Sequence, residues 1–120
     1  PIPLDEAAMQ AGADYLVGEH DFNAFKAEGS NLVGTVRRVD SLQISRQGSM
    51  VYLDITGNGF LYNMVRILTG TLLEVGSGTR RPEKMKEIIA AKNRDMAGRT
   101  APPEGLFLLH VGYEGERETV

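Results

Sequence analysis

The chain has 120 residues, of which 42% are hydrophobic and 24% charged, with a net charge of −3. This composition indicates one globular domain and excludes an intrinsically disordered chain. The absence of cysteine excludes a disulfide scaffold, a thiolate metal site and a cysteine nucleophile. Since the chain has only two histidines, we also expect no metal site.

The first half of the chain predicts one helix and a β-hairpin. Apolar residues recur at helical spacing over residues 4–17, and Asp5 is placed to cap this helix. Residues 20–31 follow without a regular pattern. Residues 35–46 and 50–56 each read as a strand, and the short turn between them predicts an antiparallel pair.

The second half predicts two helices and a final strand. Residues 60–75 carry the strongest helical pattern, and residues 82–92 predict a further helix. After a proline-containing loop, residues 106–113 predict a strand, and residues 114–120 a flexible tail. Residues 1–113 are therefore expected to form one α+β domain, in which helices cover a small, mainly antiparallel sheet.

Targeting signals and charge say less about function. No apolar stretch is long enough to cross a membrane, and the first residues lack the pattern of a secretion signal. The chain starts with Pro rather than Met, which favours a piece of a longer protein.

The charges of residues 80–99 sum to +4, which leaves a polyanionic partner open, although a solvated helix face explains the same charges.

Arg66 is the only charged residue between Asp54 and Glu74, and it lies in the middle of an apolar helical pattern. An unpaired guanidinium in such a place is costly, so we expect a carboxylate or phosphate partner. Asp54 and Glu74 are possible partners, as is a group from outside this chain. The alternative is a structural ion pair, or a side chain that reaches solvent.

Gly57-Asn58-Gly59-Phe60 joins the second predicted strand to the helix that follows. Glycine permits tight turns and close backbone approach, and Asn58 is placed to cap the helix. Backbone N–H groups at a helix N-terminus suit an anion, but a plain strand-to-helix turn explains the same residues. No phosphate-loop motif and no nucleophile elbow occur in the chain.

The run GNGFLYNMVRILTGTLLEVGSG (57–78) resembles the most characteristic segment of TruA-type tRNA pseudouridine synthases. Three further segments are similar to that family in the same order: HDFNAF with TVRRV, PEKMKEIIAAKNRDMAG, and RTAPPEGLFLLHVGY. The resemblance extends over residues 18–113 and concerns only the C-terminal half of the family. Its nucleophilic aspartate belongs to a motif in the N-terminal half that does not occur here.

The resemblance implies the C-terminal half of a tRNA pseudouridine synthase, an isomerase that acts on the tRNA anticodon stem-loop without a cofactor. Arg66 matches the basic residue that pairs with the catalytic aspartate of the absent half. Leu106 matches the apolar residue that lines the uracil pocket, and Asn58 and Phe60 match residues at its entrance, although core packing also explains Phe60 and Leu106. The candidates for RNA contacts are Arg37, Arg38, Arg80, Arg81 and Arg99.

The same resemblance implies a cytoplasmic homodimer of the full-length protein, no membrane partner, and a 120-residue chain that is inactive alone. A non-catalytic RNA-binding or dimerisation module is the alternative. An unrelated α+β domain is a third possibility, which the four ordered segments disfavour.

Overall fold

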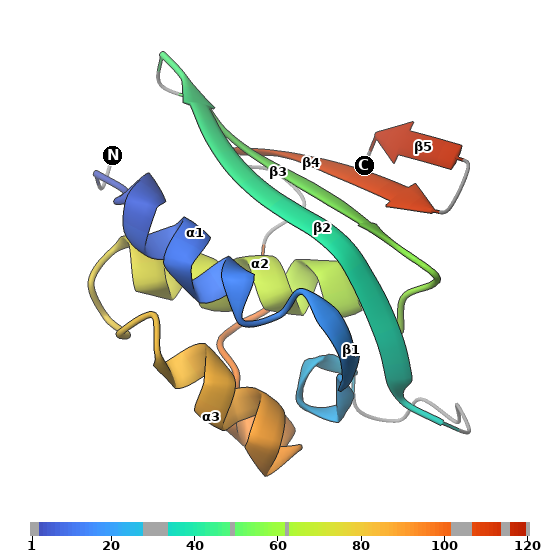
Figure 1. Ribbon diagram of the computed structural model, residues 1–120. Coiled ribbons are helices and arrows are strands. Elements are labelled where there is room, and N and C mark those ends of the chain that lie inside the picture. Colours follow the sequence, from blue (N-terminus) through green and yellow to red (C-terminus); the bar gives the residue numbers. More distant parts are fainter. Residues whose placement is uncertain are drawn as a thin grey trace.

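The computed structural model describes residues 3–27, 34–48, 50–61, 63–101, 107–113 and 116–119. Five strands form one sheet in the order β1-β2-β3-β4-β5. β3 and β4 are parallel, and the other neighbouring strands are antiparallel. Helices α1, α2 and α3 lie on one side of this sheet (Figure 1). The α+β class with a mainly antiparallel sheet is therefore confirmed.

The elements follow in chain order. They are α1 (Glu6–Asp14), β1 (Gly18–Asp21), the 3-10 helix η1 (Asn23–Phe25), β2 (Val36–Gln47), β3 (Met50–Gly57), α2 (Met64–Gly76), α3 (Lys84–Ala91), the 3-10 helix η2 (Arg94–Met96), β4 (Phe107–Tyr113) and β5 (Glu116–Thr119). None of the described residues belongs to a helix long and apolar enough to cross a membrane.

The β2–β3 hairpin agrees with its prediction to within a residue or two. Val51, Leu53 and Ile55 of β3 are buried, and the residues between them are half-buried. On β2 the register shifts between Val39 and Ser41, so that Val39 and Leu42 are both buried although they are three residues apart. This bulge keeps both side chains in the core.

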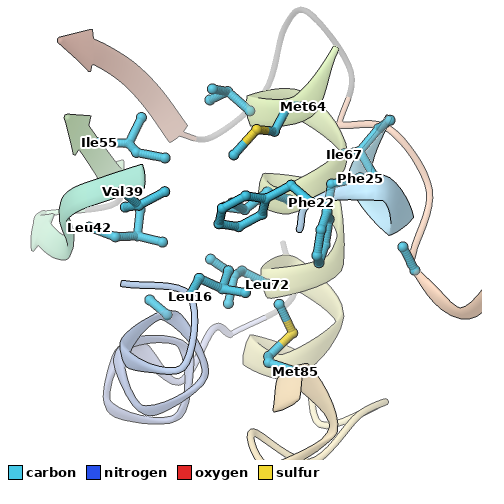
Figure 2. Packing of buried hydrophobic residues seen from close by; sticks show 14 of the residues in the cluster. Leu16, Phe22, Phe25, Val39, Leu42, Ile55, Met64, Ile67, Leu72 and Met85 are labelled. Carbon is cyan, nitrogen blue, oxygen red and sulfur yellow. The ribbon is translucent and has the colours of Figure 1, made fainter. Parts of the chain in front are cut away.

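The core lies between the sheet and the helices α1, α2 and α3, all of which contribute buried side chains. Phe22 sits between the sheet residues Val39 and Leu42 and the side chains of α2 (Figure 2). Phe22 and Phe25 are fully buried, and their ring centroids are 6.3 Å apart. The segment that the sequence left without a pattern therefore contains the end of the short strand β1 and the 3-10 helix η1, and it brings two aromatic rings into the core.

Three predicted boundaries differ from the structure by more than a residue or two. The first helix is shorter than predicted, although Asp5 caps it by accepting the N–H of Ala8 at 3.0 Å. The second predicted helix begins four residues later, at Met64. The predicted flexible tail 114–120 contains β5, which pairs with β4 through residues 116–119.

Candidate functional site

The end of β3, the loop after it and the first turn of α2 carry three of the predicted site residues, Asn58, Phe60 and Arg66. Gly57 ends β3 so close to β2 that an added Cβ would overlap the Arg38 carbonyl oxygen. The Asn58 N–H donates to that carbonyl at 3.0 Å, and Asn58 Oδ1 accepts the Arg38 N–H at 2.8 Å. Asn58 thus extends the β2–β3 pairing by one step.

Asn58 does not cap α2, so that expectation is wrong. The residue before the helix is Asn63, whose backbone is left-handed with φ of 58° and whose side chain makes no capping hydrogen bond. Asparagine tolerates this conformation better than most residues. The left-handed residue separates the glycine loop from the helix, so the helix N-terminus does not lie directly behind Asn58.

Of the other two predicted pocket residues, the structure describes only Phe60. Phe60 is half-buried and packs against the edge of the core. One edge of its ring lies 3.4 Å from the position that a Cβ on Gly57 would take. Leu106 lies outside the described residues.

Arg66 is half-buried in the first turn of α2, and its acceptor is a backbone carbonyl. Its Nε and Nη2 donate to the Ala101 oxygen at 3.2 Å and 2.8 Å. The Ala101 N–H in turn donates to the Arg66 carbonyl at 2.9 Å. Within the described ranges no carboxylate pairs with Arg66, so the local partners Asp54 and Glu74 are excluded as its ion pair.

The hydrogen bonds of Arg66 leave one edge of its guanidinium unused. A guanidinium carries five N–H donors, and the Ala101 carbonyl accepts two of them. The two donors on Nη1 and one on Nη2 have no acceptor in the described part of the chain. One of the Nη1 donors and the Nη2 donor lie along the Nη1–Nη2 edge, whose geometry fits a carboxylate or a phosphate in two parallel hydrogen bonds.

The five arginines proposed for RNA contacts are not brought together in one patch. Arg37 and Arg38 lie on β2 beside the glycine loop, where Arg37 donates to the Val36 carbonyl and Arg38 pairs with Asp40 at 2.7 Å. Arg81 is 85% exposed between α2 and α3, with Glu83 3.6 Å away. The remaining two, Arg80 and Arg99, line a shared hollow.

This hollow has a volume of about 610 Å³ and lies along α2 and the segment after η2. Arg80 donates to the Met96 carbonyl at 2.6 Å, and Arg94 donates to the Gly98 carbonyl at 2.9 Å. Arg99 is exposed and has no acceptor in the described part of the chain. Arg94, which was not among the predicted RNA contacts, also lines this hollow.

Sequence reasoning also missed Ala101, the acceptor of Arg66, because an alanine in a loop carries no visible signal. Gly70 was detectable. A glycine in the middle of a helix lowers its stability relative to alanine unless a close contact requires it, and Gly70 lies where the Arg99 carbonyl touches α2. Among the described residues no group of three His, Asp or Glu side chains could hold a metal ion.

Comparison with known proteins assigns the family. The model of the tRNA pseudouridine synthase family matches residues 13–114. The tRNA pseudouridine synthase A of Brevibacillus brevis is 50% identical over 112 residues, which cover 93% of this chain and 46% of the relative. That of Acetivibrio thermocellus is 47% identical over 110 residues, or 92% of this chain and 45% of the relative.

A third relative, the tRNA pseudouridine synthase A of Bacillus pumilus, is 46% identical over 114 residues, which cover 95% of this chain and 46% of the relative. The chain thus spans about half the length of the curated relatives that it matches. The family match covers most of the chain and includes the glycine loop, Arg66 and Ala101. This chain belongs to the tRNA pseudouridine synthase family.

Proposed function

We propose that this chain is the C-terminal half of an enzyme that converts uridine to pseudouridine in the tRNA anticodon stem-loop. The observation that carries the proposal is the state of Arg66. Its guanidinium is held by a backbone carbonyl, and the edge that fits a carboxylate meets none in the described part of the chain. Because the relatives are about twice as long, we propose that the carboxylate comes from the part of the protein outside this chain, its N-terminal half.

The reaction is an isomerisation in which atoms balance without a cofactor. The bond between ribose C1′ and uracil N1 breaks, and a bond between C1′ and C5 forms. N1 gains a proton and C5 loses one, so no oxidant or reductant is needed. An ionised aspartate of the N-terminal half acts on the sugar or assists the rearrangement of the base.

Arg66 has two tasks in this reaction. A bidentate pair fixes the orientation of the carboxylate, and the positive charge keeps the carboxylate ionised. Ala101 occupies the Nε–Nη2 edge of the guanidinium, so the remaining Nη1–Nη2 edge faces the partner. Arginine suits this task better than lysine. The rigid, planar guanidinium can bind a carbonyl along one edge and a carboxylate along another, whereas the ammonium group of lysine has no such edges.

The uracil pocket is proposed to include Asn58, Phe60 and Leu106. The Oδ1 of Asn58 is engaged by the Arg38 N–H, which leaves the amide Nδ2 without an acceptor in the described part of the chain. Nδ2 can therefore donate to a carbonyl of the base. The half-buried ring of Phe60 supplies an apolar surface beside it.

Phosphate contacts are proposed for Arg37, Arg38, Arg80, Arg81 and Arg99. Arg99 and Arg81 are the most available, because Arg99 has no acceptor in the described part of the chain and Arg81 is 85% exposed. The uridine must leave its stack to reach the pocket, so backbone contacts supply much of the affinity. We further propose a cytoplasmic homodimer of the full-length protein, and no activity of the 120-residue chain alone.

The test uses the full-length protein that carries this chain, with Arg66→Ala, Arg66→Lys and Arg46→Ala as variants. Arg46 is a matched control, since it is a hydrogen-bonded arginine outside the proposed site. We expect Arg66→Ala to lower the rate of pseudouridine formation by about a hundredfold or more, while tRNA binding stays nearly unchanged. Equal losses of binding and turnover would contradict the pairing role.

A non-catalytic RNA-binding or dimerisation module is the second candidate. It predicts that the full-length protein binds tRNA with a steep salt dependence but forms no pseudouridine. The enzyme is favoured because the relatives are named tRNA pseudouridine synthase A, and the unused edge of Arg66 fits the carboxylate that such an enzyme needs.

A further inference from the structure

Residues 97–101, which we call the strap, run along α2 in the opposite direction. The Gly98 N–H donates to Thr71 Oγ1 at 2.8 Å, and the Ala101 N–H donates to the Arg66 carbonyl at 2.9 Å. The strap is therefore fixed to the helix at both ends. Its last residue is the one that holds the Arg66 guanidinium.

Two glycines set the distance between the strap and the helix. An added Cβ on Gly70 would overlap the Arg99 carbonyl oxygen and lie 3.0 Å from the Ala101 nitrogen. An added Cβ on Gly98 would overlap the Glu74 carboxylate. At Gly70 the obstacle is backbone, which cannot rotate aside as a side chain does, so any side chain there must push the strap away from α2.

The position of the strap decides how Arg66 is oriented. Ala101 is 1% exposed, so its carbonyl is shielded from water and needs the two guanidinium donors that it accepts. If the strap moves outward, the Ala101 oxygen moves with it. The guanidinium then loses the bonds that fix the plane of its free edge.

We propose that Gly70 is a positioning residue for catalysis: by letting the strap touch α2, it places the Ala101 carbonyl so that Arg66 is held ready for its carboxylate partner. This inference rests on the proposed function. Gly70 touches neither substrate nor the reacting atoms and acts only through Ala101 and Arg66.

The chain offers a matched control on the same helix. An added Cβ on Gly76 would lie 2.7 Å from Met9 Sδ and 2.8 Å from Met9 Cγ, which belong to a flexible side chain. Gly70→Ala and Gly76→Ala thus make the same chemical change in α2, and each creates a crowded contact. Only Gly70→Ala displaces the strap.

The first measurement follows hydrogen exchange of the Arg66 Nε–H by NMR, with arginine labelled with ¹⁵N in the full-length protein. We expect exchange to be about tenfold faster or more in Gly70→Ala and unchanged in Gly76→Ala. If Gly70→Ala fails to fold, Thr71→Val takes its place, because it loosens the strap by removing the acceptor of the Gly98 N–H without adding bulk. Unchanged exchange in the variant would overturn the inference, whatever the activity.

The second measurement separates kcat from KM for tRNA. Gly70→Ala is expected to lower kcat by about tenfold or more while KM changes little, and Gly76→Ala to leave both constants near wild type. In an Arg66→Lys background, Gly70→Ala should cost little more, since both changes disturb one element. Full additivity of the two substitutions, or faster exchange with unchanged kcat, would overturn the positioning role.

The two proposals fail in different ways. If the wild-type protein forms no pseudouridine, the proposed function is wrong, and the exchange measurement still shows whether Gly70 orients Arg66. If the wild type is active and Gly70→Ala behaves like Gly76→Ala in both measurements, the function stands and the inference about Gly70 is wrong.

Discussion

The buried hydroxyl of Thr71 accepts the backbone N–H of Gly98 at an N–O distance of 2.8 Å, across 27 residues of sequence. The same hydroxyl donates to the Ile67 carbonyl at 2.8 Å. Thr71 is 0% exposed, so it joins the interior of α2 to the strap without access to water. A threonine in an apolar helix thus serves a contact that sequence spacing does not reveal.

Replacing Thr71 by valine should lower the free energy of unfolding by about 1–3 kcal/mol, because a buried N–H loses its acceptor. Thr69→Val is the control. Thr69 is also buried and donates to the carbonyl four residues earlier, the Val65 oxygen at 2.7 Å, but it accepts nothing from the strap. Urea unfolding measures both variants, and equal losses would show that the bond to Gly98 contributes nothing.

Asp5 stabilises the start of α1. Its Oδ1 accepts the Ala8 N–H at 3.0 Å. Asp5→Ala should cost about 1 kcal/mol in unfolding free energy, whereas Asp5→Asn should keep most of that stability, because asparagine caps helices equally well. Thermal and urea unfolding check the pair, and an asparagine variant as unstable as the alanine variant would rule out the cap.

The ion pair between Glu6 and Arg46 predicts a pH dependence. Arg46 Nε donates to Glu6 Oε1 at 2.8 Å and Nη2 to Oε2 at 3.2 Å. This hydrogen bonding holds the pKa of the Glu6 carboxyl below its ordinary value of 4.5. A carboxyl whose pKa is lowered by folding adds stability above its ordinary pKa, and that stability is lost as the pH falls through the folded value.

Glu6→Gln should therefore destabilise the protein at pH 7 and have a diminishing effect below about pH 4.5. The effect is expected to be small, since both side chains reach solvent. In an Arg46→Ala background the difference at pH 7 should shrink. An effect that is independent of pH, or unchanged without Arg46, would refute the pairing.

Asn58 does not cap α2 but bonds to β2, and substitution of Asn58 tests this contact. Its Oδ1 accepts the Arg38 N–H, so Asn58→Ala should destabilise the β2–β3 end by about 1 kcal/mol. Asn58→Asp retains the acceptor oxygen and should be milder. Amide exchange at Arg38 measures this contact directly. Equal protection of the Arg38 amide in the wild type and in Asn58→Ala would contradict it.

Local patterns predicted the elements whose causes are local. The hairpin follows from alternation in β3, and the α1 cap follows from a side chain three residues from its donor. The start of α2 was misplaced because the left-handed backbone of Asn63 leaves no trace in apolar spacing. The strand β5 forms by pairing with β4, and its short polar sequence gives no pattern from which a strand could be predicted.

The residues of the candidate site likewise differ in whether the sequence or only the structure reveals them. Arg66 was found because a lone charge in an apolar helix is visible in sequence. Its acceptor, Ala101, lies 35 residues away and acts through its backbone, so only the structure shows it. The predicted RNA-contacting arginines were chosen by charge, and the structure separates Arg37 and Arg38 from the hollow that Arg80 and Arg99 line.

The most direct test of the proposed function is pseudouridine formation on unmodified tRNA by the 120-residue chain, measured beside the full-length protein. We expect activity in the full-length protein and none in the chain alone, because we propose that the carboxylate partner of Arg66 lies in the other half. Activity of the purified chain would contradict the account, since one of its own aspartates would then perform the chemistry.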